Sequence, residues 1–504
     1  MTQSPAWPFP GSRDLFREPL CRAEDLGMPI PDSPDACSVA LPLWSHAVGY
    51  EEQDPAIIDR MQCGYPRFFF HPAVAALMAA AQARFGGPGS VCFAFPSLRT
   101  AERCTAYIFA KHGVKAPVKA FGSCDVHIVI CSSDHAPTAK AFWQYTGLVV
   151  SSRRARSALS GTINEDDLGA DARRTIRDRL AAFYSVTAGD VLLFPSGMGA
   201  IFEANRLASE IHPGRRRVHL EFPFLDTLKV QQEFAGDVSL YTAVGGDDFV
   251  QLISAGEPLG AVMSEIPSNP LLKTIDFDKI MPVVRHQGGL VIVDDTLATP
   301  FNVNASRHAD IIVISLTKYF CGHGDVFAGA LVLNPASSHY GRLYAGAHAN
   351  HEELLWGPDA AVLEERSRDF ESRVRRINKV AAELADYLRD HTAIETIYYP
   401  KFDHVGGYED LRVENGLYGG LISILLHDAP RTAPQFYDRL RISKGPSLGT
   451  NYTLVCPYTL LAHYRELDWA ESHGVSRWLL RISVGMEDSA DLRARFGEAL
   501  SGLS

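Results

Sequence analysis

The amino-acid sequence predicts an α/β protein in three parts: an N-terminal arm and accessory α/β module (1–145), a large domain with a mostly parallel sheet (146–392) and a smaller α/β domain (393–504). Short apolar runs alternate with helical stretches from about residue 150 onward, which is the pattern of an α/β domain. The final part has strand and helix signals of its own. The chain has 504 residues, 46% of them hydrophobic, which is enough for more than one core.

The N-terminal part changes character along its length. Residues 1–35 are rich in Pro, Asp and Arg and predict an irregular arm. A helical stretch at His71–Phe85 and a short strand at Val126–Ile130 follow. These elements are enough for a small α/β module, for which we expect a structural or interface role.

The other two parts contain clear strand and helix signals. Helices are expected at Asp171–Phe183 and Asp278–His286, and one long charged helix at about Leu363–Arg389 leads to the C-terminal domain. Strands are expected in that domain at Leu421–Leu426 and Leu479–Val484. The strand candidates of the large domain are Val191–Phe194, Ala261–Glu265, Leu290–Val293, Ile311–Ser315 and Ala330–Leu333.

The composition argues against several kinds of partner. A net charge of -11 disfavours nucleic acid or an anionic membrane surface, because phosphate binding needs a positive field. No apolar run is long enough to span a bilayer, and the first residues lack the pattern of a secretory signal. Nine cysteines without a C-x-x-C pair fit reduced thiols. We expect a soluble cytoplasmic protein that binds small molecules.

Four motifs follow predicted strands, at the edge where open α/β sheets bind ligands. The first is FPSGMGA (194–200). Its glycines let the backbone approach an anion, and the helix that follows offers free N–H groups. Alone, such a segment is commonly just a tight turn. The second is EIPSNP (265–270), in which Asn269 lies between a strand end and a proline.

The third and fourth motifs place opposite charges at the same edge. Three β-branched residues precede Asp294, and a buried carboxylate needs a cationic partner such as a protonated pyridine nitrogen. Lys318 follows the strand Ile311–Ser315, and partial burial there would lower its pKa, which is the condition for Schiff-base and proton-transfer chemistry. The hydroxyls of Ser315 and Thr317 can hydrogen-bond a phosphate.

Each motif also has an ordinary explanation. Taken alone, Lys318 would be a surface lysine after a strand, and Asp294 could be a capping residue. Together, a phosphate cradle, an Asn, an Asp for a ring nitrogen and a Lys are the parts that pyridoxal phosphate (PLP) chemistry requires. We therefore predict a PLP enzyme with Lys318 as the cofactor lysine. No metal site is predicted, because His323 and His463 lack paired ligand spacing.

The same motifs resemble a known family. SGMGA, E-x-PSNP, VDDTLATP, SLTKYFCGHGD and LLRISVGMED are similar to the Cys/Met-metabolism family of fold-type I PLP enzymes, which includes cystathionine γ-synthases and γ-lyases. Further segments resemble the longer, fungal-type cystathionine γ-synthases: LPLWSHAVGYEE (41–52), GYPRFFFH (64–71), FWQYTG (142–147) and SLGTNYTLVCPYTLLAHY (447–464). The resemblance extends over nearly the whole chain.

The resemblance implies a role for each residue at the substrate side of the site. Lys318 would form the Schiff base and move protons. Asp294 would pair with the pyridinium nitrogen, and Asn269 would face the 3-oxygen of the ring. Arg481 would bind the substrate α-carboxylate, a task that suits its bidentate geometry.

The resemblance also implies the phosphate ligands. They would be the backbone N–H groups of Gly197 and Met198 together with the side chains of Ser315 and Thr317. Arg153 resembles an arginine that reaches the phosphate from a neighbouring subunit, which would make the site a property of a homodimer or homotetramer. A solvated basic helix end is an equally good explanation for Arg153.

The sequence departs from the family at several positions. Most members stack a tyrosine on the PLP ring; Phe224 is the best match here, so the stacking remains and the hydroxyl is lost. Ser151 replaces the tyrosine of the usual Tyr-x-Arg phosphate motif. Tyr452 stands near the substrate entrance where many relatives carry a glutamate, and Thr453 beside it is a further candidate for substrate contact. These departures bear on the substrate, not on the cofactor.

The implied reaction is γ-substitution on an O-activated homoserine with a thiol such as cysteine, as in transsulfuration and methionine biosynthesis. The freed amine of Lys318 would remove the α proton and then the β proton. One alternative is a γ-lyase or a γ-synthase of specialised metabolism with another nucleophile. A second is a non-catalytic relative, against which the intact Lys, Asp, Asn and Arg set argues.

Overall fold

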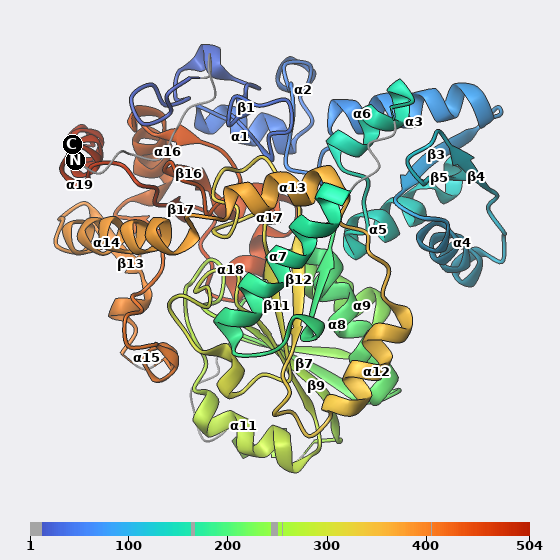
Figure 1. Ribbon diagram of the computed structural model, residues 1–504. Helices are drawn as coiled ribbons and strands as arrows, with labels where there is room; N and C mark the ends of the chain where they lie inside the picture. Colours follow the sequence, from blue (N-terminus) through green and yellow to red (C-terminus); the bar gives the residue numbers. More distant parts are fainter. Residues whose placement is uncertain are drawn as a thin grey trace.

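A computed structural model of the chain describes residues 13–162, 167–242 and 250–503, except 252, 255 and 405. Three large sheets organise these residues, beside one two-stranded pair (Figure 1). A seven-stranded sheet lies at the centre, a five-stranded sheet is built by the C-terminal residues, and a three-stranded sheet stands to one side with its own helices. The domain boundaries at 145 and 392 stay predictions.

The seven-stranded sheet is mostly parallel, as predicted. Its strand order is β6-β12-β11-β10-β9-β7-β8, and only β12 runs antiparallel to its neighbours. The strands are β6 (Val191–Phe194), β7 (Arg216–Leu220), β8 (Val238–Tyr241), β9 (Leu259–Glu265), β10 (Leu290–Asp294), β11 (Ile311–Ser315) and β12 (Gly329–Leu333).

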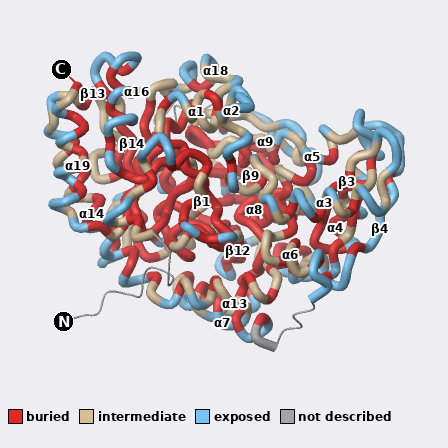
Figure 2. The backbone as a smooth tube through the Cα atoms, turned by 90° about the horizontal axis from the view of Figure 1, so that it is seen from above, coloured by how far each residue is buried: buried red, intermediate tan, exposed pale blue. Residues whose placement is uncertain are grey.

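Helices cover both faces of this sheet, which explains why its strands are apolar along their whole length. In β10, Val291 and Val293 face one core while Leu290 and Ile292 face the other, because successive side chains alternate. One face packs against α8 (Gly197–Ile211) and α12 (Tyr340–Asn350), and the other against α7 (Asp167–Tyr184), α11 (Phe277–His286) and α13 (Gly357–Arg366). The buried chain is therefore densest at the centre of the molecule (Figure 2).

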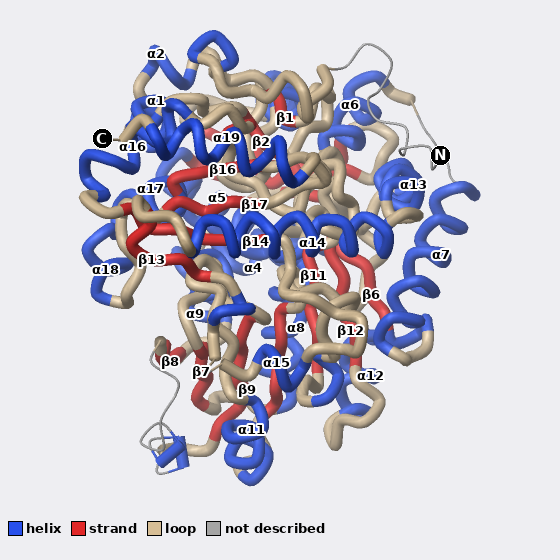
Figure 3. The backbone as a smooth tube through the Cα atoms, turned by 90° about the vertical axis from the view of Figure 1, so that its left-hand side faces the viewer, coloured by secondary structure: helices blue, strands red, loops and turns tan. Residues whose placement is uncertain are grey.

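The five-stranded sheet has the order β13-β14-β17-β16-β15 and a core of its own. Helices α14 and α19 cross one face of it (Figure 3). The strands are β13 (Ile394–Tyr398), β14 (Leu421–Leu426), β15 (Ser443–Lys444), β16 (Leu454–Pro457) and β17 (Leu480–Ser483). The helices of this region are α14 (Phe370–Arg389), α15 (Tyr408–Leu411), α16 (Ala429–Arg439), α17 (Tyr458–His463), α18 (Leu467–Ser472) and α19 (Ser489–Ser501).

The single long helix predicted at Leu363–Arg389 is wrong: it is divided into α13 and α14 by Ser367–Asp369. The Ser367 hydroxyl donates to the Glu364 carbonyl and accepts a hydrogen bond from Arg179. A serine that bonds its neighbouring backbone competes with helix propagation, and the tertiary contact with Arg179 stabilises the break.

The N-terminal region has two parts. Its arm includes the β1–β2 pair (Pro29–Ile30, Ser38–Val39) and lies on the C-terminal sheet, where Lys444 donates to the Pro42 carbonyl at 2.8 Å. The module beyond it is an antiparallel sheet of order β3-β5-β4: β3 (Ser90–Phe95), β4 (Val118–Phe121) and β5 (Val126–Ser132). The helices are α1 (Trp44–Glu51), α2 (Pro55–Ile58), α3 (Pro72–Phe85), α4 (Leu98–His112), α5 (Ala136–Thr146) and α6 (Ser152–Ser160).

Among the helices of the described ranges, none combines the length and the apolar character that crossing a bilayer requires.

Candidate active site

A cavity of about 680 Å³ lies at the carboxyl edge of the central sheet, where the N-terminal and C-terminal regions meet it. All four predicted motifs reach its wall, because the parallel strands β9, β10 and β11 end side by side. The predicted residues that line the cavity are Gly197, Met198, Phe224, Asn269, Asp294, Ser315, Lys318 and Arg481.

The start of α8 provides an anion site. Ser196 caps the helix by accepting from the Gly199 N–H at 3.1 Å. The preceding amides of Gly197 and Met198 belong to the first turn, whose N–H groups have no intrahelical partner and carry the positive end of the helix dipole. A Cβ on Gly197 would lie 2.7 Å from the Ser315 Cβ, so only glycine allows this close approach. The helix start and Ser315 therefore form one cradle of N–H and hydroxyl groups, which suits an anion such as a phosphate.

Two carboxylates lie opposite this cradle in paired register. Asp294 on β10 pairs with Glu265 on β9, and both line the cavity. Burial raises the pKa of Asp294 to about 6. Burial, and then the adjacent Asp294, raise the pKa of Glu265 well above its usual range. Neither carboxylate has an ion pair within the described part of the chain, and a protonated ring nitrogen fits this position because it would supply the missing positive charge.

The amine of Lys318 is buried and faces no carboxylate among the described residues. Its Nζ donates to the Ser447 Oγ at 3.2 Å and lies 4.5 Å from the centroid of the Tyr65 ring. The lysine is only 8% exposed. A desolvated amine held by a hydroxyl and an aromatic face is available for covalent chemistry, which a salt-bridged lysine is not.

Arg481 on β17 presents its guanidinium to the same cavity. It donates to the Asn269 Oδ1 at 3.3 Å and to the Pro446 carbonyl at 2.8 Å, and its Cζ lies 4.9 Å from the centroid of the Tyr458 ring. These neutral partners orient the group and leave its charge unpaired within the described residues. It is suited to a carboxylate ligand.

Sequence reasoning missed the cavity residues of the N-terminal region, among them Tyr65 and Arg67. Arg67 is 2% exposed, pairs with Asp226 and lies 5.7 Å from the centroid of the Phe224 ring. The signal was present, because Tyr65-Pro66-Arg67 has the Tyr-x-Arg spacing that the sequence analysis sought at 151–153. A phenol therefore stands beside Lys318 although Phe224 lacks one.

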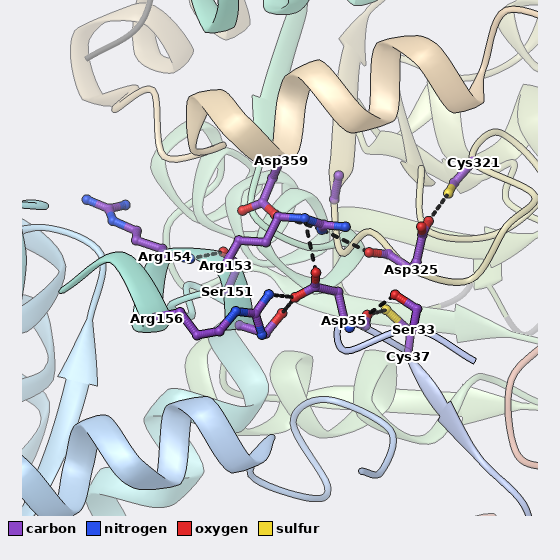
Figure 4. A network of polar contacts seen from close by, with 12 residues as sticks. Ser33, Asp35, Cys37, Ser151, Arg153, Arg154, Arg156, Cys321, Asp325 and Asp359 are labelled. Carbon is purple, nitrogen blue, oxygen red and sulfur yellow. Dashed lines mark hydrogen bonds and ion pairs between the residues drawn. The ribbon is translucent and has the colours of Figure 1, made fainter. Parts of the chain in front are cut away.

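Four predicted side chains do not reach the cavity. The Thr317 hydroxyl bonds both backbone groups of Ala328. Arg153 is bound by carboxylates of its own chain (Figure 4). The other two precede β16 and are held elsewhere: the Tyr452 hydroxyl donates to the His323 carbonyl at 3.4 Å, and the Thr453 hydroxyl donates to the Glu487 carboxylate at 2.7 Å.

Known proteins resemble this chain along most of its length. It is 32% identical to a cystathionine γ-synthase of Neurospora crassa, over 94% of this chain and 98% of that protein. It is also 32% identical to an L-2-amino-4-chloropent-4-enoate dechlorinase/desaturase of Streptantibioticus cattleyicolor, over 94% and 98% respectively. A similar solved structure is the crystal structure of a cystathionine γ-synthase from Xanthomonas oryzae pv. oryzae in complex with aminoacrylate and cysteine. It aligns with a TM-score of 0.56 and 25% identity and covers 66% of this chain and 87% of that one. This alignment confirms the predicted fold.

Two family models match. Residues 73–151 match the N-terminal domain of fungal trans-sulfuration enzymes, which corresponds to the accessory module. Residues 168–501 match the Cys/Met metabolism PLP-dependent enzymes, and this range contains the whole strand-end cradle, the carboxylate pair, Lys318 and Arg481. The predicted cofactor is thereby confirmed, and the chain belongs to the Cys/Met metabolism family of PLP-dependent enzymes.

Proposed function

We propose that the protein catalyses γ-substitution on an O-activated homoserine, with a thiol such as cysteine as the incoming nucleophile. One observation carries this proposal: a single cavity of small-molecule size joins an anion cradle, a carboxylate pair, a buried amine and an arginine that has no ion pair among the described residues. When PLP is bound, it supplies an electron sink for charge that develops on the substrate. The similarity to the Neurospora crassa cystathionine γ-synthase supports this choice of reaction.

The cavity residues of this chain have different proposed roles in the reaction. Arg481 holds the substrate α-carboxylate, and Asn269 keeps the guanidinium in place. Lys318 accepts and returns protons, since its Nζ is desolvated and hydrogen-bonded only to a hydroxyl among the described residues. Phe224 offers an apolar face on the same wall. We propose these roles from position, burial and charge.

The solvent-facing side of the cavity supports an amino acid as the second substrate. Glu51 at the end of α1, Lys140 on α5 and Arg465 all line it. Burial raises the pKa of Glu51 to about 7, although Arg465 opposes this shift. A carboxylate near Arg465, with the cation Lys140 in the same lining, offers charges of both signs to the ammonium and carboxylate groups of a zwitterion such as cysteine.

Elimination is the second candidate function. It is favoured by the similarity to the dechlorinase/desaturase. The two reactions separate in one assay: purified holoenzyme is supplied with an O-acyl-homoserine, with and without cysteine, and the products are identified by mass spectrometry. Substitution yields cystathionine only with cysteine; equal release of ammonia and 2-oxobutyrate in both samples contradicts it.

We also propose that the protein is a cytoplasmic homodimer or homotetramer. All nine cysteines are free, which suits a reducing compartment. Phe68, 44% exposed beside the cavity, leaves an apolar side chain that a second subunit could cover. Mixing Lys318→Ala and Arg67→Ala subunits tests whether Arg67 serves the cavity of a neighbouring subunit, because activity returns in the mixture only in that case.

A further inference from the structure

Behind the wall of the active site, one arginine joins three segments that are distant in sequence (Figure 4). Arg153, in the first turn of α6, lies with its Nε 3.3 Å from the Asp35 Oδ2 of the N-terminal arm. Its Nη1 is 3.1 Å from the Asp359 Oδ1 of α13 and donates to the Asp325 carbonyl oxygen at 2.9 Å. Asp325 belongs to the turn that follows Lys318.

That turn is held closely on its other sides. Gly322 has a φ of +71°, and a Cβ there would lie 2.7 Å from the Asn451 Oδ1. The Cys37 N–H of the arm donates to the Gly324 carbonyl at 2.8 Å. The Gly322 N–H in turn donates to the Lys318 carbonyl at 2.8 Å. A displacement at Asp325 is therefore transmitted through one hydrogen-bonded turn to the backbone of Lys318.

The ion pairs of the network show why the charge of Arg153 matters for the turn that follows Lys318. Asp325 and Asp359 are almost completely buried. The Asp325 carboxylate pairs with Arg366 at 3.3 Å, while Arg153 bonds the Asp325 backbone carbonyl. Asp35 has Arg156 as a second cation beside Arg153. For Asp359, Arg153 is the only ion-pair partner in the described residues. Loss of the Arg153 charge thus leaves a buried carboxylate unpaired beside the turn, which favours rearrangement of the segment.

We propose that Arg153 is a positioning residue for Lys318: it clamps the turn 322–325 between the N-terminal arm and α13, and thereby sets where the lysine amine stands in the cavity. The arm continues to Pro66 and Arg67, which border the space beside Arg153. The contacts of Arg153 therefore fix the position of the cofactor lysine relative to the segment that carries Tyr65. This role rests on Lys318 as the cofactor lysine and is independent of the substrate.

The test compares Arg153→Gln with the wild-type protein by two measurements that need no substrate. The first is the pH midpoint of the visible absorbance band of the holoenzyme, which reports the environment of Lys318; we expect it to move by about 0.5 pH units or more. The second is amide hydrogen exchange in the peptide that spans 318–325 of the apo-protein, which we expect to become about tenfold faster.

Arg156→Gln is the matched control. Arg156 pairs with the same Asp35 but has no contact with Asp359 or the turn among those the structure shows, so both measurements should stay at wild-type values. A wild-type midpoint together with a wild-type exchange rate in Arg153→Gln overturns the proposal.

The double variant Arg153→Gln/Asp359→Asn separates positioning from general stability. It removes the unpaired carboxylate, so thermal stability should recover while the shifted midpoint and the fast exchange persist. Recovery of all three would show that Arg153 only neutralises charge. A wild-type preparation without any visible band would count against Lys318 as the cofactor lysine, whereas the exchange measurement would still decide whether the clamp exists.

Discussion

The protein has two groups of buried charges near its active site, one behind the cavity wall and one in the cavity. They differ in whether each charge has an ion-pair partner. In the network behind the cavity, Arg153 is paired directly with both Asp35 and Asp359. In the cavity itself, Lys318 and Arg481 have no ion pair within the described ranges and rest on hydroxyl, carbonyl and aromatic groups. An unpaired buried charge lowers stability. We therefore infer that the cavity charges bind charged ligands, while the paired charges stabilise the fold.

Removal of the cavity amine should have the largest effect. In Lys318→Ala, the covalent attachment of PLP is lost, and we expect activity to fall by more than about a thousandfold. Borohydride reduction of the native holoenzyme followed by peptide mass spectrometry should locate the cofactor at Lys318. Lys119→Ala, an exposed position on β4, serves as the control and should retain both the label and the activity. A fully active Lys318→Ala protein would contradict the catalytic role of Lys318 and favour the explanation of Lys318 as an ordinary lysine after a strand.

Replacement of the unpaired arginine should be the next largest effect. Arg481→Lys keeps a positive charge but loses the bidentate geometry, and we expect kcat/KM for the homoserine substrate to fall about 10–100-fold. Arg477→Lys, which alters an arginine paired with Asp468 and Glu471 at the surface, should change little. Equal effects of the two substitutions would contradict the distinction between ligand-binding and scaffold charges.

Substitution of Asp294, the carboxylate proposed to face the ring nitrogen, should have opposite effects on the stability of the apo-protein and of the holoenzyme. Burial raises the pKa of Asp294 from 3.8 to about 6, so the folded apo-protein binds the extra proton between these values and loses stability as pH rises through them. At pH 7, apo Asp294→Asn should therefore be more stable than the wild type by about 1–3 kcal/mol. With PLP bound, the wild type should be the more stable protein. Denaturant unfolding of both forms at pH 4 and pH 7 measures this; a less stable apo variant at pH 7 contradicts it.

The smallest effect is expected at the solvent side of the cavity. Glu51→Gln should raise the KM for cysteine up to about fivefold, the scale of a partly solvated ion pair, and leave the KM for the homoserine substrate unchanged. Glu52→Gln is the neighbouring control, because Glu52 instead accepts from the Tyr464 hydroxyl. A parallel change of both KM values in Glu51→Gln would argue against a separate subsite for the nucleophile.

The strand-end motifs show which parts of the site can be predicted from the sequence. Asp294 and Lys318 could be placed because each directly follows an apolar parallel strand, and such strands end at one edge of their sheet. Tyr65 and Arg67 could not be placed in this way, since they reach the cavity on a segment about 250 residues earlier, with no strand to set their position. The break at Ser367 likewise depends on Arg179, a residue on another helix.

What this sequence determined by itself was local: strand and helix periodicity, the glycine-rich helix start and the order of the chemical groups, all of which depend on residues within a few positions of one another. The tertiary structure alone decided which charges are paired. Arg153 and Arg481 are both arginines on regular elements. Arg153 meets two carboxylates and a backbone carbonyl, whereas Arg481 meets neutral groups, because long-range contacts determine the surroundings of a buried charge.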